Sequence, residues 1–421
     1  MSKSIIILGA NYETSHLVES ALNLFDEVFV ADPYEHSPCK LIKGVIPVNV
    51  DVCNVPLVVK ICRSHKIEAV ALGVADRLVI PYAQICKELN LPAFLSVKTA
   101  EALNDKQLFN KELKKNGLRG IPVLDEEESQ NHISSGRRVV VKPVDANSSK
   151  GLTIVSHAEH LLDAIEKAKH FSARKMVLIE PFMEEPGIGI YLTFLNGECI
   201  NVSVYERIES KCRTGLNNLP VGAIYKSKYK KIYLEKLHNK LSSLLINIGF
   251  LNGVLLFSGY ITKNGIVVYD PGARLQGEGA DVAVKYYTGI DQKELLLNIA
   301  RGDSSLDKKT SFIKRNKKTL ASIWIYLSEG KIAKVKNLDK ADKQPWLLES
   351  RVRLDVGSEI KSTMINTEGS VFARFYVCFE SRAEYLKIVD WFYENLMVYD
   401  FEGGNMIIDS RQALTDVEYN D

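Results

Sequence analysis

The first hundred residues alternate short apolar runs with amphipathic segments, and this pattern restricts what the chain can fold into. The runs that favour strands are SIIILGA, EVFVADP, KGVIPVNV and AVALGV. Helical spacing of apolar residues follows in SHLVESALNLF, VPLVVKICRSH and PYAQICKELN. Strands that alternate with helices form parallel sheets covered by helices on both faces. The pattern therefore predicts a doubly wound, Rossmann-like sheet.

The turn after the first run argues against a dinucleotide site. GANYET carries only one glycine of the G-x-G-x-x-G fingerprint, so an NAD-linked dehydrogenase is not favoured. The apolar run before it ends at Gly9, too early for a signal peptide, and a buried first strand is the better interpretation.

Composition excludes several function classes. The net charge is +2, from 54 basic and 52 acidic residues, whereas a general nucleic-acid binder has a strong basic excess. No segment approaches the roughly 20 apolar residues that a membrane span needs. The seven cysteines are scattered without a C-x-x-C pair, which predicts reduced thiols, a cytoplasmic location and no zinc site.

The pattern changes further along the chain. Residues 98–117 predict one helical segment that stops at Gly117. Antiparallel pairing follows, with Asn-Gly turns at 196–197 and 264–265 between apolar runs. The basic run 307–318 predicts a solvated connection, with a phosphate-binding patch as the alternative. Beyond it, further strands and the helix RAEYLKIVDWFYENL predict a small α+β unit.

The stretch VVVKPVDANSSKGLTIV carries the first chemical signal. Lys142 ends an apolar strand, which would hold its ammonium in place and lower the entropic cost of meeting a phosphate. Ser148, Ser149 and Gly151 offer hydroxyls and backbone N–H groups, and Lys150 adds positive charge. A surface hairpin can look the same, so this loop alone does not decide the function.

Other charged residues strengthen the phosphate interpretation. Lys106 stands at a helix start, where a cation is unusual unless an anion is near. Glu180 ends the apolar run VLIEPF. Asp270, Arg274 and Glu278 follow one strand in YDPGARLQGEG, and a carboxylate beside an arginine suits a magnesium-bound phosphate.

This ordered set of motifs resembles the ATP-grasp superfamily of the carboxylate–amine ligase type, similar to biotin carboxylase, carbamoyl-phosphate synthase and L-amino acid ligase-like proteins. The resemblance covers residues 1 to about 300. It implies an α/β and α+β fold: a Rossmann-like pre-ATP-grasp domain at 1–97, a two-lobed ATP-grasp domain at 98–305 and a small C-terminal α+β domain at 306–421. The nucleotide-clamping lobe falls at about 120–190.

The resemblance also implies a nucleotide site. Lys106 and Lys142 match the family's two phosphate-binding lysines, one for each lobe, and residues 148–151 match its flexible loop over the phosphates. Glu180 matches the hinge carboxylate that accepts a hydrogen bond from the adenine amino group. Backbone contacts and an apolar wall are expected from Phe182 and Met183.

The same resemblance implies a catalytic arginine and a weakened metal site. Arg274 matches the residue that stabilises the transferred phosphate, with Lys142 as its catalytic partner. Asp270 matches a magnesium ligand, and Glu278 is a further candidate ligand for Mg²⁺. Leu256 and Gly272 stand where the family has its other metal-binding residues, and neither can bind metal through its side chain.

The function implied is an ATP-dependent ligase that joins a small carboxylate to an amine through an acyl phosphate, with ADP as product. The alternative is a degenerate nucleotide-binding protein, because Gly187 also replaces the usual ribose-binding acid. The sequence does not identify either substrate. Residues 205–230 are expected to line the substrate pocket, and a homodimer is possible. The candidate substrate contacts are Glu206, Arg213 and Lys226.

Overall fold

A computed structural model of the protein describes residues 3–144, 151–172, 174–185, 187–210, 219–303 and 316–417. The chain divides into two compact units. The first comprises Met1–Val202, Ile232–Glu278 and Ile290–Ser311, and the second comprises Ser203–Lys231, Gly279–Gly289 and Phe312–Asp421. The three-domain division expected from the sequence stays a prediction.

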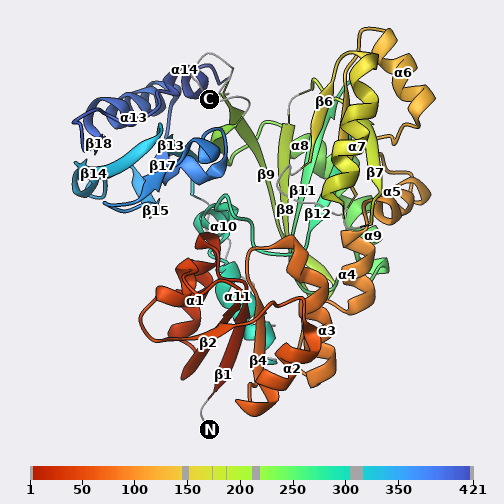
Figure 1. The fold of residues 1–421 in the computed structure, drawn as a ribbon, viewed down its shortest axis with the longest axis horizontal. Coiled ribbons are helices and arrows are strands. Elements are labelled where there is room, and N and C mark those ends of the chain that lie inside the picture. Colours follow the sequence, from red (N-terminus) through yellow and green to blue (C-terminus); the bar gives the residue numbers. More distant parts are fainter. Residues whose placement is uncertain are drawn as a thin grey trace. The chain divides into compact units, whose positions relative to one another are not determined.

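The first unit begins with the predicted parallel sheet, in the order β3-β2-β1-β4 (Figure 1, red and orange). Helix α1 packs against α11, and α2 packs against α3. The strands are β1 (Ser4–Leu8), β2 (Glu27–Asp32), β3 (Val45–Asn49) and β4 (Ala69–Leu72). The helices are α1 (Ser15–Leu22), α2 (Val55–Ser64), α3 (Val79–Leu89) and α11 (Gln292–Ala300). Strand β1 is buried along its whole length, as strands of a helix-covered parallel sheet are.

A small three-stranded antiparallel sheet, β6-β5-β7, follows with its own hydrophobic core. Alternate residues of β5 point to opposite faces, so Val139 and Val141 enter this core and Lys142 faces the other way. The strands are β5 (Val139–Pro143), β6 (Thr153–Val155) and β7 (Val177–Pro181), and the helices are α6 (Glu126–Ser134) and α7 (Leu161–Phe171).

The remaining strands of the first unit are β8 (Gly187–Leu195), β11 (Gly253–Thr262) and β12 (Gly265–Gly272), which pair antiparallel in the order β12-β11-β8. Asn196 and Gly197 both have positive φ, as a two-residue hairpin turn requires, so the predicted hairpin is confirmed. The helices that precede β11 are α8 (Lys230–Tyr233), a π-helical turn (Leu234–His238) and α9 (Asn239–Asn247).

The single helical segment predicted for 98–117 is wrong in one respect, since the structure has two helices, α4 (Val97–Asn104) and α5 (Lys106–Lys115). Asp105 separates them because its backbone is extended. Its carboxylate accepts hydrogen bonds from the backbone N–H groups of Gln107 and Leu108, at 2.9 and 3.0 Å, and so caps α5. This cap fixes Lys106 as the first residue of α5.

The cap gives a stability prediction. Asp105→Ala is expected to lower the free energy of unfolding by about 1 kcal/mol, because two N–H groups at the start of α5 lose their acceptor. Asp105→Asn keeps an acceptor oxygen and should cost only a few tenths of that amount. Urea unfolding of both variants measures the difference, and equal losses for Ala and Asn would contradict the capping role.

The second unit contains most of β9 (Glu198–Glu209), which continues into an antiparallel sheet in the order β9-β10-β13-β17-β15. Trp324, Phe372 and Phe375 are fully buried in its core, together with Phe392 of the predicted amphipathic helix. The strands are β10 (Pro220–Ile224), β13 (Thr319–Tyr326), β14 (Gly330–Lys336), β15 (Leu347–Val352), β16 (Glu359–Ile360), β17 (Val371–Phe379) and β18 (Met397–Asp400). The helices are α10 (Ala280–Thr288), α12 (Leu338–Ala341), α13 (Arg382–Asn395) and α14 (Arg411–Thr415).

Candidate active site

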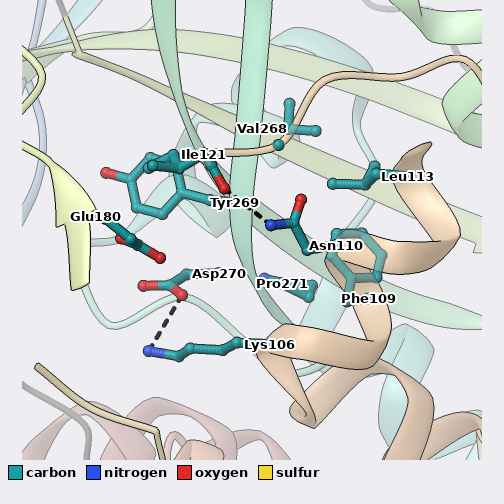
Figure 2. Close-up of a pocket in the computed structure, with 11 residues that line it drawn as sticks. Lys106, Phe109, Asn110, Leu113, Ile121, Glu180, Val268, Tyr269, Asp270 and Pro271 are labelled. Carbon is teal, nitrogen blue, oxygen red and sulfur yellow. Dashed lines mark hydrogen bonds and ion pairs between the residues drawn. The ribbon is translucent and has the colours of Figure 1, made fainter. Parts of the chain in front are cut away.

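Lys106 and Asp270 form an ion pair between the start of α5 and the end of β12. Figure 2 shows the two side chains pointing toward each other, and Lys106 Nζ lies 3.2 Å from Asp270 Oδ1. The first turn of a helix has a positive electrostatic potential, which disfavours a lysine there unless an anion is close. Asp270 supplies that anion in the structure.

A β-bulge in β12 sets the direction of Asp270. Ser258 of β11 lies opposite Tyr269, but Leu256 lies opposite Gly272, so β12 carries one extra residue between these pairs. Asp270 lies within this bulge and has a φ of 48°, a left-handed conformation that aspartate tolerates better than most residues. Bulges commonly redirect a side chain next to a functional site.

Lys142 and Glu180 form a second, more buried ion pair. They come from the adjacent strands β5 and β7, at diagonal positions on one face of the small sheet. Lys142 Nζ lies 2.7 Å from Glu180 Oε2, and each side chain is only 11% exposed. Lys142 Nζ also lies 5.8 Å from the ring centroid of Tyr269 in β12, so this pair reaches the strand that carries Asp270.

The electrostatics of these residues show that the two ion pairs belong to one cluster. Burial lowers the pKa of Lys142 most, but Asp270 and Glu180 outweigh it and the pKa is raised overall. Burial raises the pKa of Glu180, and the ammonium of Lys142 opposes this shift, as does Lys106 more weakly. We call Lys106, Lys142, Glu180 and Asp270 the charge cluster. The two lysines thus approach one region from different elements.

The charge cluster gives a pH prediction. In Lys142→Met, Glu180 loses the cation that opposes the effect of burial, so its folded-state pKa should rise further above its unfolded value. The folded state then holds a proton that the unfolded chain releases, and stability should fall as pH rises from about 4.3 through the folded-state pKa. The expected loss relative to the unmodified protein is about 1.4 kcal/mol for each pKa unit of added shift.

Thermal unfolding between pH 4 and pH 8 measures how steeply the stability of Lys142→Met falls with rising pH. Lys142→Met combined with Glu180→Gln is the control, because the double variant has no buried carboxyl group left to titrate at this position. A slope that persists in the double variant would contradict the role given to Glu180.

A pocket lies beside the charge cluster (Figure 2). One side carries Lys106, Glu180 and Asp270, whereas the rest is mostly apolar. The further lining residues are Phe109, Asn110, Leu113, Gly120, Ile121, Val268, Tyr269 and Pro271. The pocket therefore has a charged end next to an apolar wall.

Part of the predicted phosphate loop can be placed. Ser148, Ser149 and Lys150 lie outside the described residues. Gly151 has a φ of 74°, and a Cβ there would meet the Phe171 side chain at 2.7 Å, so only glycine fits this end of the loop.

One backbone group of the predicted hinge, at Phe182, already has a hydrogen-bond partner within the protein. The N–H of Phe182 donates to the carbonyl of Arg138 at 2.9 Å, and the Arg138 guanidinium carbon lies 3.9 Å from the centroid of the Phe182 ring. The backbone N–H of Phe182 is thus already paired, and the contact expected from Met183 stays a prediction.

Arg274 is already held by a residue that sequence reasoning missed. Its Nε and Nη2 each donate to the Asp76 carboxylate at 2.6 Å, and Nη1 donates to the Leu275 carbonyl at 2.8 Å. Glu278 accepts from the Gln276 side chain at 2.6 Å. Asp76 directly follows the loop after β4, and an acid at the carboxyl end of a buried parallel strand was the signal that could have found it.

The metal prediction rests on Asp270. Leu256 and Gly272, where other ligands were expected, face each other across β11 and β12, and neither side chain has an oxygen. In the described part of the chain, no group of three or more His, Cys, Asp or Glu side chains is placed to hold a metal ion. Mg²⁺ is often bound by one or two carboxylates together with substrate phosphates, and Asp270 fits a cation held in that way.

The candidate substrate contacts lie in the second unit. The Glu206 carboxylate accepts a hydrogen bond from the N–H of Lys228 at 3.0 Å. Lys226 is exposed, and Arg213 lies outside the described residues. Their role stays a prediction.

Comparisons with known proteins identify the fold. No protein-family model matches the chain, and no curated protein does. Among solved structures, phosphoribosylglycinamide synthetase from Anaerococcus prevotii is 19% identical, with a TM-score of 0.74, over 94% of this chain and 99% of that one. L-amino acid ligase from Bacillus licheniformis is 17% identical, with a TM-score of 0.73, over 94% of this chain and 98% of that one.

A third similar structure is the biotin carboxylase domain of 2-oxoglutarate carboxylase from Hydrogenobacter thermophilus, in complex with MgADP, ADP and bicarbonate. It is 15% identical, with a TM-score of 0.76, over 99% of this chain and 93% of that one. At these identities the likeness shows the fold, and the ATP-grasp fold predicted from the sequence is confirmed. Among the described helices, none combines the length and apolar character needed to cross a membrane.

Proposed function

We propose that the protein is an ATP-dependent ligase that joins a small carboxylate to an amine through an acyl-phosphate intermediate and forms ADP. The observation that carries this proposal is the charge cluster, in which Lys106 and Lys142 approach one region from different elements. Two lysines held in this way suit a polyphosphate. The similar solved structures include ligases and a complex with MgADP, which supports the same function.

In this reaction the charged residues of the site would bind the phosphates and stabilise the transferred phosphoryl group. ATP transfers its terminal phosphoryl group to the carboxylate, the amine attacks the acyl phosphate, and inorganic phosphate leaves. Lys106 and Lys142 would exchange their carboxylate partners for phosphate oxygens and offset the negative charge. The guanidinium of Arg274 would face the transferred phosphoryl group, where charge builds up in the transition state. A divalent cation held by Asp270 and the phosphates would supply further charge neutralisation.

The hinge and the pocket would hold the base. Glu180 lies near the end of β7 at the edge of the pocket, and Met183 follows two residues beyond this strand. Together they would offer an acceptor and a donor to the edge of an adenine ring. A phosphate loop at 148–151, a pocket lining at 205–230, a cytoplasmic location and a homodimer belong to the same proposal.

Two measurements test the function. ATP and ADP should raise the melting temperature, and the protein should release ADP from ATP in the presence of one member of a panel of amino acids and small carboxylates paired with amines. Stabilisation by nucleotide without turnover on any pair would favour the degenerate nucleotide-binding protein instead. No stabilisation by either nucleotide would overturn the proposal.

A further inference from the structure

Asp76 holds Arg274 more completely than a surface ion pair would. Both carboxylate oxygens accept from the guanidinium at 2.6 Å, and the remaining terminal nitrogen donates to the Leu275 carbonyl at 2.8 Å. The Arg274 side chain is 16% exposed and that of Asp76 is 29% exposed. A bidentate pair fixes both the position and the plane of the guanidinium.

We propose that Asp76 is the positioning residue for Arg274, and that its carboxylate takes the space a side chain at position 272 would otherwise fill. The proposal rests on the proposed function, because it assigns Arg274 to the transferred phosphoryl group. It names a residue that the family resemblance does not include.

The surroundings of Gly272 support the second half of the proposal. A Cβ at this position would lie 3.1 Å from Asp76 Oδ1 and 3.1 Å from Leu256 Cγ, closer than ordinary contact. Gly272 is not among the glycines with positive φ, so its backbone does not require glycine. A side chain here would require Asp76 or Leu256 to shift by a few tenths of an ångström, so Asp76 is one of the two groups that limit the space at this position.

The location of Asp76 explains what it adds. It begins the short helical turn Asp76–Leu78 between β4 and α3, at the carboxyl edge of the parallel sheet. Arg274 follows β12, which carries Asp270. The pair thus ties the end of β12 to the parallel sheet within the first unit. Burial lowers the pKa of Arg274 most, but Asp76 outweighs it and raises the pKa overall, so the guanidinium stays charged.

Nucleotide discrimination tests the positioning role. Asn at position 76 offers one acceptor and one donor, and the donor would face an N–H of Arg274, so the guanidinium must turn. Asp76→Asn should bind ADP within about twofold of the unmodified protein but lose at least about tenfold in affinity for AMP-PNP, which carries the third phosphate. Asp76→Glu keeps the charge but moves the carboxylate, and it should show the same selective loss of affinity for AMP-PNP relative to ADP.

A matched control is available in the same unit. Asp303 pairs with Arg301 at 2.7 Å, with side-chain exposures of 25% and 27%, so Asp303→Asn removes a similar ion pair elsewhere. It should leave the ratio of the two affinities unchanged. If Asp76→Asn and Asp76→Glu also leave that ratio unchanged, the positioning role is wrong. If the unmodified protein binds neither nucleotide, the proposed function fails first, and the two failures are thus distinguishable.

The shared space is tested separately by stability. Gly272→Ala should lower the melting temperature because its Cβ crowds Asp76. In an Asp76→Ser background, where the side chain is shorter, the same substitution should cost less. The loss of melting temperature in the double variant should therefore be smaller than the sum of the losses in the two single variants. Additive losses would show that Asp76 does not occupy this space.

Discussion

Lys142→Met is expected to abolish the stabilisation that ADP gives the unmodified protein. A ligand at about 100 times its Kd stabilises the folded state by about 2.7 kcal/mol, and the variant should show almost none of this. The physical reason is that Lys142 is a nearly buried ammonium, oriented by Glu180 and facing Tyr269, and methionine keeps its apolar stem but removes the charge. Thermal unfolding with and without ADP measures the effect.

The control for this prediction is Lys169→Met. Lys169 forms an ion pair with Glu166 of the same length, 2.7 Å, on the exposed side of α7. A phosphate site at Lys142 predicts that Lys169→Met keeps the full response to ADP. If ADP stabilises Lys142→Met as well as it stabilises the control, the charge cluster does not bind phosphate.

Most of the fold was accessible from the sequence because local signals agree with the tertiary structure. The four strands of the parallel sheet are apolar runs, and the hairpin at 196–197 has the Asn-Gly turn that its positive φ angles need. Helix α6 was missed because EEESQNHIS buries only Ser129 and Ile133, which leaves no apolar period to detect. The break at Asp105 was missed because helical spacing continues across it and the decisive signal is one capping side chain.

The charge cluster was predicted in part. Lys106, Lys142 and Glu180 stand at the ends of elements with clear periodicity, so their positions could be expected. The bulge at Asp270 could not, since register depends on how two strands pair rather than on either sequence alone. Asp76 lies 198 residues from Arg274 in the chain, and no local pattern links two such residues.

Asp270→Asn is expected to remove the effect of Mg²⁺ on ADP binding. Lys106 and Asp270 neutralise each other at 3.2 Å, so a phosphate must draw Lys106 away before it binds, and a cation must free Asp270. A phosphate that binds Lys106 therefore leaves Asp270 available for the cation, and a cation that binds Asp270 leaves Lys106 available for the phosphate. By linkage, Mg²⁺ must strengthen ADP binding by the same free energy as ADP strengthens Mg²⁺ binding. For the unmodified protein we expect Mg²⁺ to tighten ADP binding about tenfold, or about 1.4 kcal/mol.

Calorimetric titration with ADP, in Mg²⁺ and in EDTA, separates the two effects of this variant. In EDTA, Asp270→Asn should bind ADP at least as tightly as the unmodified protein, because Lys106 is no longer neutralised and one negative charge is gone. Added Mg²⁺ should then change nothing. Asp105→Asn is the control, since Asp105 adjoins Lys106 but its carboxylate caps α5 and pairs with Arg174. If Mg²⁺ tightens ADP binding equally in Asp270→Asn and Asp105→Asn, the cation is held elsewhere and Lys106 does not compete with it for Asp270.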